Sequence, residues 1–236
     1  MSNSDNETTA ATPPSLHPNL VVSPSKAHRI LFTKLRNLDT SCGDFVKYAK
    51  RSMRILVEDA LAEFPTTPLS ITTPCGPYKG LDSIVVTEPT RLCAVSIVRS
   101  GDCLLDQVRE VEPSCTVGKI LIQRDETSPN KEARLLYTKM PPLHKLDYVI
   151  LCDPMLATGG SAKTALNVLC KEPYRIPPSK IIFCNMICAP EGLQAMAKAY
   201  PDVKIVTACI DECLNAEKFI VPGLGDFGDR YFNTVE

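Results

Sequence analysis

The sequence has no tryptophan, only three histidines and no long apolar run, and its charges almost cancel. Its 236 residues carry a formal net charge of −1 at pH 7, so no overall positive field attracts nucleic acid or an acidic membrane. The longest apolar stretch, 181–189, is too short to cross a bilayer. Residues 1–15 have neither the apolar core of a secretion signal nor the arginines of a transit peptide. We therefore expect a cytoplasmic protein that binds neither nucleic acid nor a membrane.

Two familiar kinds of binding motif are missing as well. The pattern G-x-x-x-x-G-K-[ST] is absent, which argues against a P-loop nucleotide hydrolase. Cysteine is plentiful, at 11 residues, but no pair forms C-x-x-C, and His17, His28 and His144 are too scattered for a zinc motif. The odd number of cysteines argues against complete disulfide pairing. We expect reduced cysteines in the core and no metal site built from protein ligands alone.

The most informative stretch is an apolar segment followed by a turn of small residues. The run 148–152 is typical of a buried parallel strand, and Asp153 follows at its end. The turn Thr158-Gly-Gly-Ser161 precedes helical spacing over 162–170. Backbone N–H groups at a helix N-terminus bind phosphate, and an acid beside them suits sugar hydroxyls or Mg²⁺. The stretch predicts a sugar-phosphate site; the alternative is an ordinary turn with an N-cap serine.

The rest of the sequence predicts one α/β domain over 16–236, preceded by a disordered polar tail, 1–15. Apolar segments rich in β-branched residues alternate with helical spacing, which is typical of a parallel β-sheet flanked by helices. The strand candidates are 92–98, 117–122, 148–152, 180–186 and 203–210.

Other segments carry their own expectations. The spacing over 44–64 predicts a long helix with apolar residues on more than one face, which indicates burial against a neighbouring subunit. Residues 65–80 predict a loop or hairpin, and 127–134 a polar loop. The tail 219–230 is too rich in glycine for a helix and too apolar for solvent. We expect it to fold back over the domain.

Two arginines are candidate phosphate ligands because each follows a strand candidate. Arg99 follows 92–98 and Arg124 follows 117–122, so a parallel sheet would place both at one crevice. Guanidinium groups bind phosphate oxygens in pairs and stay charged. Two of them beside a separate phosphate site predict a highly charged group such as pyrophosphate. The alternative is that both are solvated charges at strand ends.

Glycines near the C-terminus form the last candidate site. Gly223, Gly225 and Gly228 flank Asp226 and Asp229. Such a loop exposes backbone N–H and C=O groups, which can recognise the edge of a flat heterocycle. The alternative is a structural loop or an interface.

Four segments together resemble the uracil phosphoribosyltransferases, within the type I phosphoribosyltransferase family. They are the donor loop 153–161, the uracil-binding tail 219–230, the pyrophosphate loop 96–101 and the strand 118–126 with its second arginine. They occur in the family's order, and the resemblance covers nearly the whole chain. It implies a parallel sheet with a C-terminal base-binding hood, and conversion of uracil and 5-phospho-α-D-ribose 1-diphosphate to UMP and diphosphate, with Mg²⁺ as cofactor.

The resemblance also implies roles for individual residues. The implied catalytic residues are Asp226, Arg99 and Arg124, with Asp226 orienting or relaying the N1 proton of uracil. Uracil is implied to contact Ile220, Gly225, Asp226 and Phe227. The implied ligands of the phosphoribosyl donor are Arg99, Arg124, Asp153, Pro154, Met155, Leu156, Ala157, Thr158, Gly159, Gly160, Ser161 and Asp226.

The chain departs from the usual family pattern at three positions: Ser100 replaces an alanine, Phe219 a tyrosine and Asn233 a glycine. Asparagine tolerates a left-handed backbone, so the turn at Asn233 is expected to survive. The resemblance further implies a homo-oligomer, dimer or tetramer, and GTP as a possible activator, although no GTP motif is visible. Two other functions stay open: a phosphoribosyltransferase for another base, and a non-catalytic regulatory protein that binds the donor or a nucleotide.

Overall fold

The computed structural model describes residues 16–124, 133–142 and 146–234; of Arg124 it describes only the backbone. The predicted tail 1–15 and most of the predicted loop 127–134 lie outside the described residues. Among the described residues, no helix is both long and apolar enough to span a membrane.

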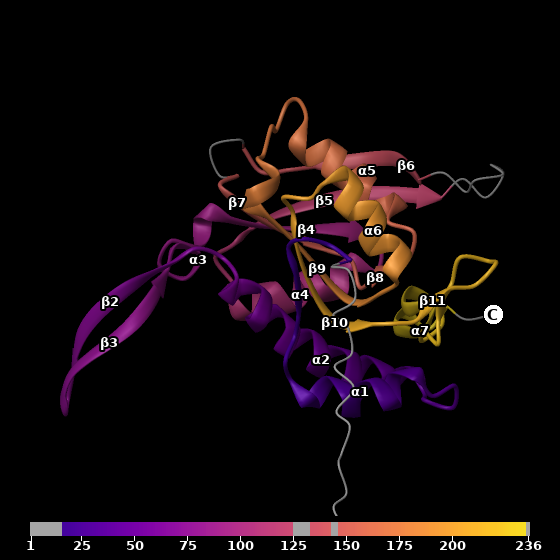
Figure 1. Cartoon of the computed structure of the whole chain (residues 1–236), viewed down its shortest axis with the longest axis horizontal. Coiled ribbons are helices and arrows are strands. Elements are labelled where there is room, and N and C mark those ends of the chain that lie inside the picture. Colours follow the sequence, from indigo (N-terminus) through magenta and orange to yellow (C-terminus); the bar gives the residue numbers. More distant parts are fainter. Residues whose placement is uncertain (1–15, 125–132, 143–145, 235–236) are drawn as a thin grey trace, which may run out of the picture.

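A mostly parallel β-sheet forms the centre of the domain (Figure 1), which confirms the predicted fold class. Neighbouring strands pair in parallel except β6, which is antiparallel to β5. The two-residue β8 (Met155–Leu156) pairs with β9. The strand order is β1 (Leu20–Val22), β10 (Lys204–Ile210), β9 (Ile181–Cys188), β7 (Tyr148–Cys152), β4 (Leu92–Val98), β5 (Thr116–Arg124) and β6 (Ala133–Lys139).

Helices cover both faces of this sheet, which is why its central strands are apolar on both sides. One face packs against α1 (Lys26–Arg36), α2 (Cys42–Ala62) and α4 (Gly101–Val111). The other face packs against α5 (Gly160–Cys170) and α6 (Pro190–Ala199). The side chains alternate accordingly: in β9, Ile182 and Cys184 belong to the first core and Phe183 to the second. Short 3₁₀ helices at Pro89–Arg91 and Pro178–Lys180 directly precede β4 and β9.

The long helix α2 forms as predicted, but its apolar faces have a different explanation. Within the chain it contacts α1, α4, α7, β9 and β10. Phe45, Ala49, Met53 and Leu56 are completely buried by these neighbours. The apolar pattern of α2 therefore does not indicate a subunit contact, and that interpretation is wrong.

The segment predicted as loop or hairpin is a hairpin that projects from the body of the domain (Figure 1). Its strands are β2 (Thr66–Thr73) and β3 (Gly76–Ser83), and the short helix α3 (Ile84–Thr87) follows. The sequence prediction missed β1 and β6. Arg134, placed in a polar loop, lies in β6, which is at the edge of the sheet and pairs with β5 alone among the described strands.

The C-terminal hood (residues 212–234) lies beside the sheet edge and contains β11 (Cys213–Leu214), β12 (Ile220–Val221) and α7 (Phe227–Phe232). The expectation that no helix forms in 219–230 is wrong. Asp226 caps α7 by accepting a hydrogen bond from the Asp229 N–H at 2.9 Å. Phe227 is fully buried, with its ring centroid 5.4 Å from that of Phe45. Capping and burial outweigh the cost of Gly228 inside the helix, about 1 kcal/mol relative to alanine.

Candidate active site

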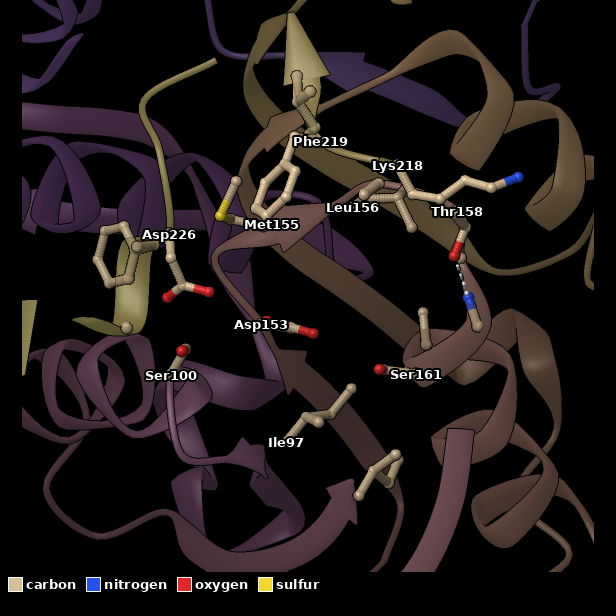
Figure 2. Close-up of a pocket in the computed structure, with 18 of the residues that line it drawn as sticks. Ile97, Ser100, Asp153, Met155, Leu156, Thr158, Ser161, Lys218, Phe219 and Asp226 are labelled. Atoms are coloured by element: carbon tan, nitrogen blue, oxygen red, sulfur yellow. Dashed lines mark hydrogen bonds between the residues drawn. The ribbon is translucent and has the colours of Figure 1, made fainter. Parts of the chain in front are cut away.

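A cavity of about 550 Å³ opens where β4, β5 and β7 end (Figure 2). Four segments distant in sequence line it: the loop after β4, the end of β5, the turn between β7 and α5, and the hood. This is the edge at which open α/β sheets bind ligands. Among the predicted site residues, the cavity is lined by Arg99, Asp153, Met155, Leu156, Ala157, Thr158, Gly159, Gly160, Ser161, Ile220, Gly225, Asp226 and Phe227.

The phosphate loop (residues 153–161) leads from β7 into α5 and forms one wall. Gly159 is the N-cap of α5, with φ of +78°, and the Thr158 hydroxyl accepts a hydrogen bond from the Gly160 N–H at 3.4 Å. Left-handed backbone of this kind favours glycine. Ser161 is the second residue of the helix rather than its cap, so the alternative of a capping serine is wrong. The first turn of α5 therefore presents its N-terminal end to the cavity, as a phosphate site requires.

Asp153 and Pro154 face different ways. Asp153 lines the cavity, and Figure 2 shows the side-chain oxygens of Asp153 and Ser161 in the same space. Pro154 is buried and is not among the lining residues. Its carbonyl accepts hydrogen bonds from the backbone N–H groups of Met186 and Ile187 at 3.0 and 3.1 Å. Pro154 thus attaches the phosphate loop to β9, on the side of the loop that faces away from the cavity.

Arg99 lies directly after β4, in residues 99–101 of the predicted pyrophosphate loop, which we call the diphosphate loop. Its guanidinium contacts the hood. Nη2 donates to Asp229 Oδ1 at 2.8 Å, and Nη1 donates to Thr234 Oγ1 at 3.2 Å. The guanidinium carbon lies 5.1 Å from the centre of the Phe232 ring. About half of the Arg99 side chain stays exposed. Arg124 ends β5, and its side chain lies outside the described residues, so its role stays a prediction.

An ion pair between Arg36 and Asp211 holds the hood in place at Gly223, shortly after β12. Arg36 of α1 binds Asp211 through both guanidinium nitrogens, at 2.7 and 2.5 Å, and also donates to the Gly223 carbonyl at 2.6 Å. Asp211 in turn accepts from the Gly223 N–H at 2.7 Å. Burial raises the pKa of Asp211, but Arg36 and the Gly223 N–H outweigh this and hold the pKa below its usual range. Gly223 of the hood is therefore hydrogen-bonded, through its carbonyl and its N–H, to an ionised pair in the body of the domain.

A second arginine attaches the helix of the hood. Arg230 of α7 donates to the carbonyl of Leu224, within the hood, at 2.7 Å. It also donates to the carbonyls of Leu35 and Asn37 at the end of α1, at 2.5 and 2.7 Å. These carbonyls lie at a helix C-terminus, where a positive charge is favourable. The segment from Gly223, which Arg36 contacts, to Arg230 is thus fixed at both ends. It includes Gly225 to Phe227.

Glycine is required in the hood at two left-handed positions. Gly223 has φ of +63° and Gly225 has φ of +80°. A Cβ on Gly223 would lie 2.1 Å from the Ile220 carbonyl oxygen. With Gly228 these residues have the G-x-G-x-x-G spacing of dinucleotide-binding loops, but they join a two-residue strand to a six-residue helix and form no βαβ unit.

The sequence prediction did not include several lining residues, of which Lys218 and Ser100 bear most directly on function. Lys218 adopts φ of 70°, which is unusual for lysine, and this is visible only in the backbone. Asn233 adopts the predicted left-handed conformation, with φ of 57°. Gly228, which belongs to the candidate glycine loop, also lines the cavity. The lining residues to which the sequence prediction gave no binding role are Ile97, Val98, Ser100, Ile122, Gln123, Ala162, Glu217, Lys218 and Phe219.

The family model for uracil phosphoribosyltransferase matches residues 22–234 of this chain. The chain belongs to the uracil phosphoribosyltransferase family. The match includes the phosphate loop, the diphosphate loop and the whole of the hood. It confirms the resemblance inferred from the four sequence segments.

Relatives within the uracil phosphoribosyltransferase family differ in length. The chain is 42% identical to the uracil phosphoribosyltransferase of Dictyostelium discoideum, over 93% of this chain and 99% of that protein. It is also 42% identical to the enzyme of the same name from Saccharomyces cerevisiae, over 86% and 90%. A chloroplastic uridine/cytidine kinase of Arabidopsis thaliana is 41% identical, and there the chain spans only 44% of the relative's length.

A solved structure has the same fold as this member of the uracil phosphoribosyltransferase family. The AQ2163 protein from Aquifex aeolicus aligns with a TM-score of 0.74 at 29% sequence identity. The alignment covers 90% of this chain and 97% of that one. The sheet and its helices thus belong to a fold that is shared at 29% sequence identity.

Proposed function

We propose that this chain converts uracil and 5-phospho-α-D-ribose 1-diphosphate to UMP and diphosphate. The observation that carries the proposal is that one cavity is lined at once by the phosphate loop, by Arg99 and by the segment Gly225–Phe227. A ribosyl donor has an anion at each end and its reacting carbon between them. The cavity offers a helix N-terminus for one anion and a guanidinium for the other.

In this proposal the two halves of the donor bind to different segments. The backbone amides from Ala157 to Ser161 bind the 5′-phosphate, and Asp153 binds the ribose hydroxyls. Arg99, with Arg124, binds the diphosphate. Arg99 is half exposed at the cavity, so its remaining N–H donors can reach a ligand without unburying the side chain.

The base is proposed to bind the hood. Ile220, Gly225 and Phe227 present backbone groups to the edge of uracil, and the left-handed Gly225 turns the chain without a side chain in the way. In Figure 2, Asp226 lies on the side of the cavity opposite Ser161 and Thr158. In the proposal the Asp226 carboxylate lies between the base and the ribose of the donor.

The reaction is a displacement at the anomeric carbon. The bond from this carbon to the diphosphate oxygen breaks, a bond to N1 of uracil forms, and N1 loses its proton. Transition states at such centres resemble oxocarbenium ions, with negative charge growing on the leaving group. Arg99 stabilises that charge, and Asp226 orients or accepts the N1 proton. Among the lining residues no Ser–His or Cys–His pair is present to act as a covalent nucleophile.

The residues present also fit Mg²⁺, which we propose as the cofactor. Asp153 and Asp226 line the cavity with carboxylate oxygens, the ligands that Mg²⁺ prefers beside substrate phosphates. When bound, the ion supplies positive charge that neutralises the diphosphate. Among the described residues, no group of three or more histidine, cysteine, aspartate or glutamate side chains could hold a metal by itself.

One assay tests the reaction and separates it from its alternatives. The purified chain is incubated with donor, Mg²⁺ and one base at a time: uracil, orotate, hypoxanthine or xanthine. Formation of UMP and diphosphate in equal amounts with uracil, and no product with the other three bases, supports the proposal. Turnover with another base would instead favour a different base specificity. Calorimetric binding of the donor without any diphosphate release would favour the non-catalytic regulatory protein.

We further propose a homo-oligomer in the cytoplasm. The hairpin β2–β3 supports the proposed oligomer, because it exposes the large apolar side chains Leu69, Ile71, Tyr78 and Leu81. Light scattering on the purified chain measures the assembly, and a monomer would refute it. GTP as an activator is implied only by the family resemblance. Adding GTP to the uracil assay tests it, and an unchanged rate over a range of donor concentrations would refute it.

A further inference from the structure

The diphosphate loop and the hood meet in a closed group of polar contacts. Arg99 donates to Asp229 and to Thr234, and the Thr234 hydroxyl itself donates to Asp229 Oδ1 at 2.6 Å. The Phe232 ring covers one face of the guanidinium. Thr234 and Arg99 hold the pKa of Asp229 below its usual range, so this carboxylate is ionised at neutral pH.

Asp229 also contacts the residue proposed to act on uracil. Its backbone N–H donates to Asp226 Oδ1 at 2.9 Å. Asp229 is the third residue of α7, and both the cap residue, Asp226, and the first residue, Phe227, line the cavity. One residue therefore contacts the donor side through its carboxylate and the base side through its amide.

The packing between these two segments leaves little room for independent motion. A Cβ on Gly228 would lie 2.6 Å from Ser100 Oγ, 3.2 Å from Arg99 Nη2 and 3.3 Å from Asp226 Oδ1. The first turn of α7 therefore rests directly on the diphosphate loop. A displacement of Arg99 must move α7, or break the contact with Asp229.

We infer that Asp229 is a positioning residue that couples binding of the diphosphate to binding of the base. This inference rests on the proposed function, in which Arg99 binds diphosphate and the start of α7 binds uracil. Asp229 and Thr234 take two of the five N–H donors of Arg99 and orient the guanidinium, leaving the others for phosphate oxygens. When diphosphate fixes Arg99, the ion pair fixes Asp229 and with it Asp226 and Phe227. By thermodynamic linkage, uracil strengthens diphosphate binding by the same factor.

The test uses uracil and inorganic diphosphate with Mg²⁺, a pair that cannot react. Calorimetry measures the Kd of uracil with and without saturating diphosphate, for the intact chain and for Asp229→Asn. Asparagine keeps the size of the side chain and removes its charge. We expect diphosphate to lower the uracil Kd at least about fivefold in the unmodified chain, within the usual range for coupled sites, and less than about twofold in Asp229→Asn. Asp202→Asn, at an exposed turn away from the cavity, is the matched control and should behave as the unmodified chain.

The outcomes separate the inference from the proposed function. If the unmodified chain makes no UMP, the proposed function fails. If it makes UMP but Asp229→Asn keeps the full effect of diphosphate, or the unmodified chain shows no effect, only the inference fails. Thr234→Val is a second variant should Asp229→Asn not fold. It removes the hydroxyl that contacts both Arg99 and Asp229 and should reduce the effect of diphosphate at least about twofold; an unchanged effect would overturn the inference.

Discussion

The carboxylate of Asp226 accepts a hydrogen bond from the backbone N–H of Asp229 and so begins helix α7. The same side chain lines the cavity between the hood and the phosphate loop. Asp226 therefore has a structural contact in addition to its proposed role in the reaction. A substitution at this position is informative only if it separates these two contributions.

Asp226→Asn makes this separation. Asparagine caps helices about as well as aspartate, so α7 should keep its start and the Tm should change little. The variant lacks the charge that is proposed to orient or accept the uracil proton. We expect kcat to fall about 100-fold or more, as for loss of a general acid–base group, with a much smaller effect on the donor KM. Steady-state kinetics with each substrate varied measures both quantities.

Asp226→Ala provides the comparison. Alanine loses both the charge and the cap, so this variant should lose activity and also about 1 kcal/mol of stability. If Asp226→Asn instead keeps the kcat of the unmodified chain, Asp226 has no part in the chemistry and only caps α7.

Gly228 and Ser100 are predicted to be energetically coupled. In Gly228→Ala the new Cβ would lie 2.6 Å from Ser100 Oγ, so the Ser100 side chain or α7 must move. We expect kcat/KM for uracil to fall about tenfold or more, because small displacements of positioning groups cost that much. Ser100→Ala removes the nearest atom, so the double variant Ser100→Ala/Gly228→Ala should recover part of the loss. A double-mutant cycle on kcat/KM measures the coupling; strict additivity would contradict the prediction.

The phosphate loop was predictable because its structure is determined locally. An apolar strand, small residues and helical spacing follow one another within 148–170, and each indicates its own conformation without reference to the rest of the chain. The parallel sheet was predictable for the same reason, since the strands β4, β7 and β9 are apolar apart from Ser96 in β4 and Asn185 in β9. These segments need no tertiary contact to be recognised.

The hood and α2 were not predictable in this way, because contacts between distant residues determine them. Helix α7 forms despite Gly228, since Phe227 packs on Phe45, 182 residues earlier in the sequence. The second apolar face of α2 is covered by α1 and α4, whose positions the spacing alone does not give. Edge strand β6 exposes Leu135, Leu136 and Tyr137, so its pattern lacks the alternation of a half-buried strand.

Lys218 supplies a positive charge that the sequence prediction did not use. It lines the cavity in a left-handed conformation, and in Figure 2 its side chain extends toward the side of the cavity where Thr158 lies. Lys218→Asn keeps a residue that tolerates this backbone and removes the charge. We expect the donor KM to rise about fivefold, near the 1 kcal/mol typical of an exposed charge pair, with little change in kcat.

The salt dependence of the donor KM gives the second readout for Lys218. Exposed charges are screened by salt, so the KM of the unmodified chain should rise more steeply with ionic strength than that of Lys218→Asn. Lys198→Gln, an exposed lysine of α6 away from the cavity, is the control and should leave both values unchanged. Identical salt slopes for Lys218→Asn and the unmodified chain would show that Lys218 does not contact the donor.

Stability should fall between pH 7 and pH 6 because of two buried histidines. His28 is buried between hydroxyl groups, with Nδ1 2.8 Å from Ser52 Oγ and Nε2 2.8 Å from Ser23 Oγ. Burial lowers the pKa of His28, an effect that Asp59 partly offsets. Burial likewise lowers the pKa of His17, and a hydrogen bond to the Tyr200 carbonyl partly offsets it.

The sign of the effect follows from these directions. Just below the unfolded pKa of about 6.5, the unfolded chain takes up protons that the folded chain does not. Stability is therefore fully present above this pH and decreases as the pH falls toward the folded values. Calorimetry at intervals from pH 7 to pH 6, below the range in which the free cysteines titrate, should show a falling Tm, and His28→Gln should lower the Tm at every pH while reducing its dependence on pH. Since the carboxylates titrate mainly below this window, an undiminished slope in His28→Gln would assign the pH dependence to another group, and His17→Asn would then show whether that group is His17.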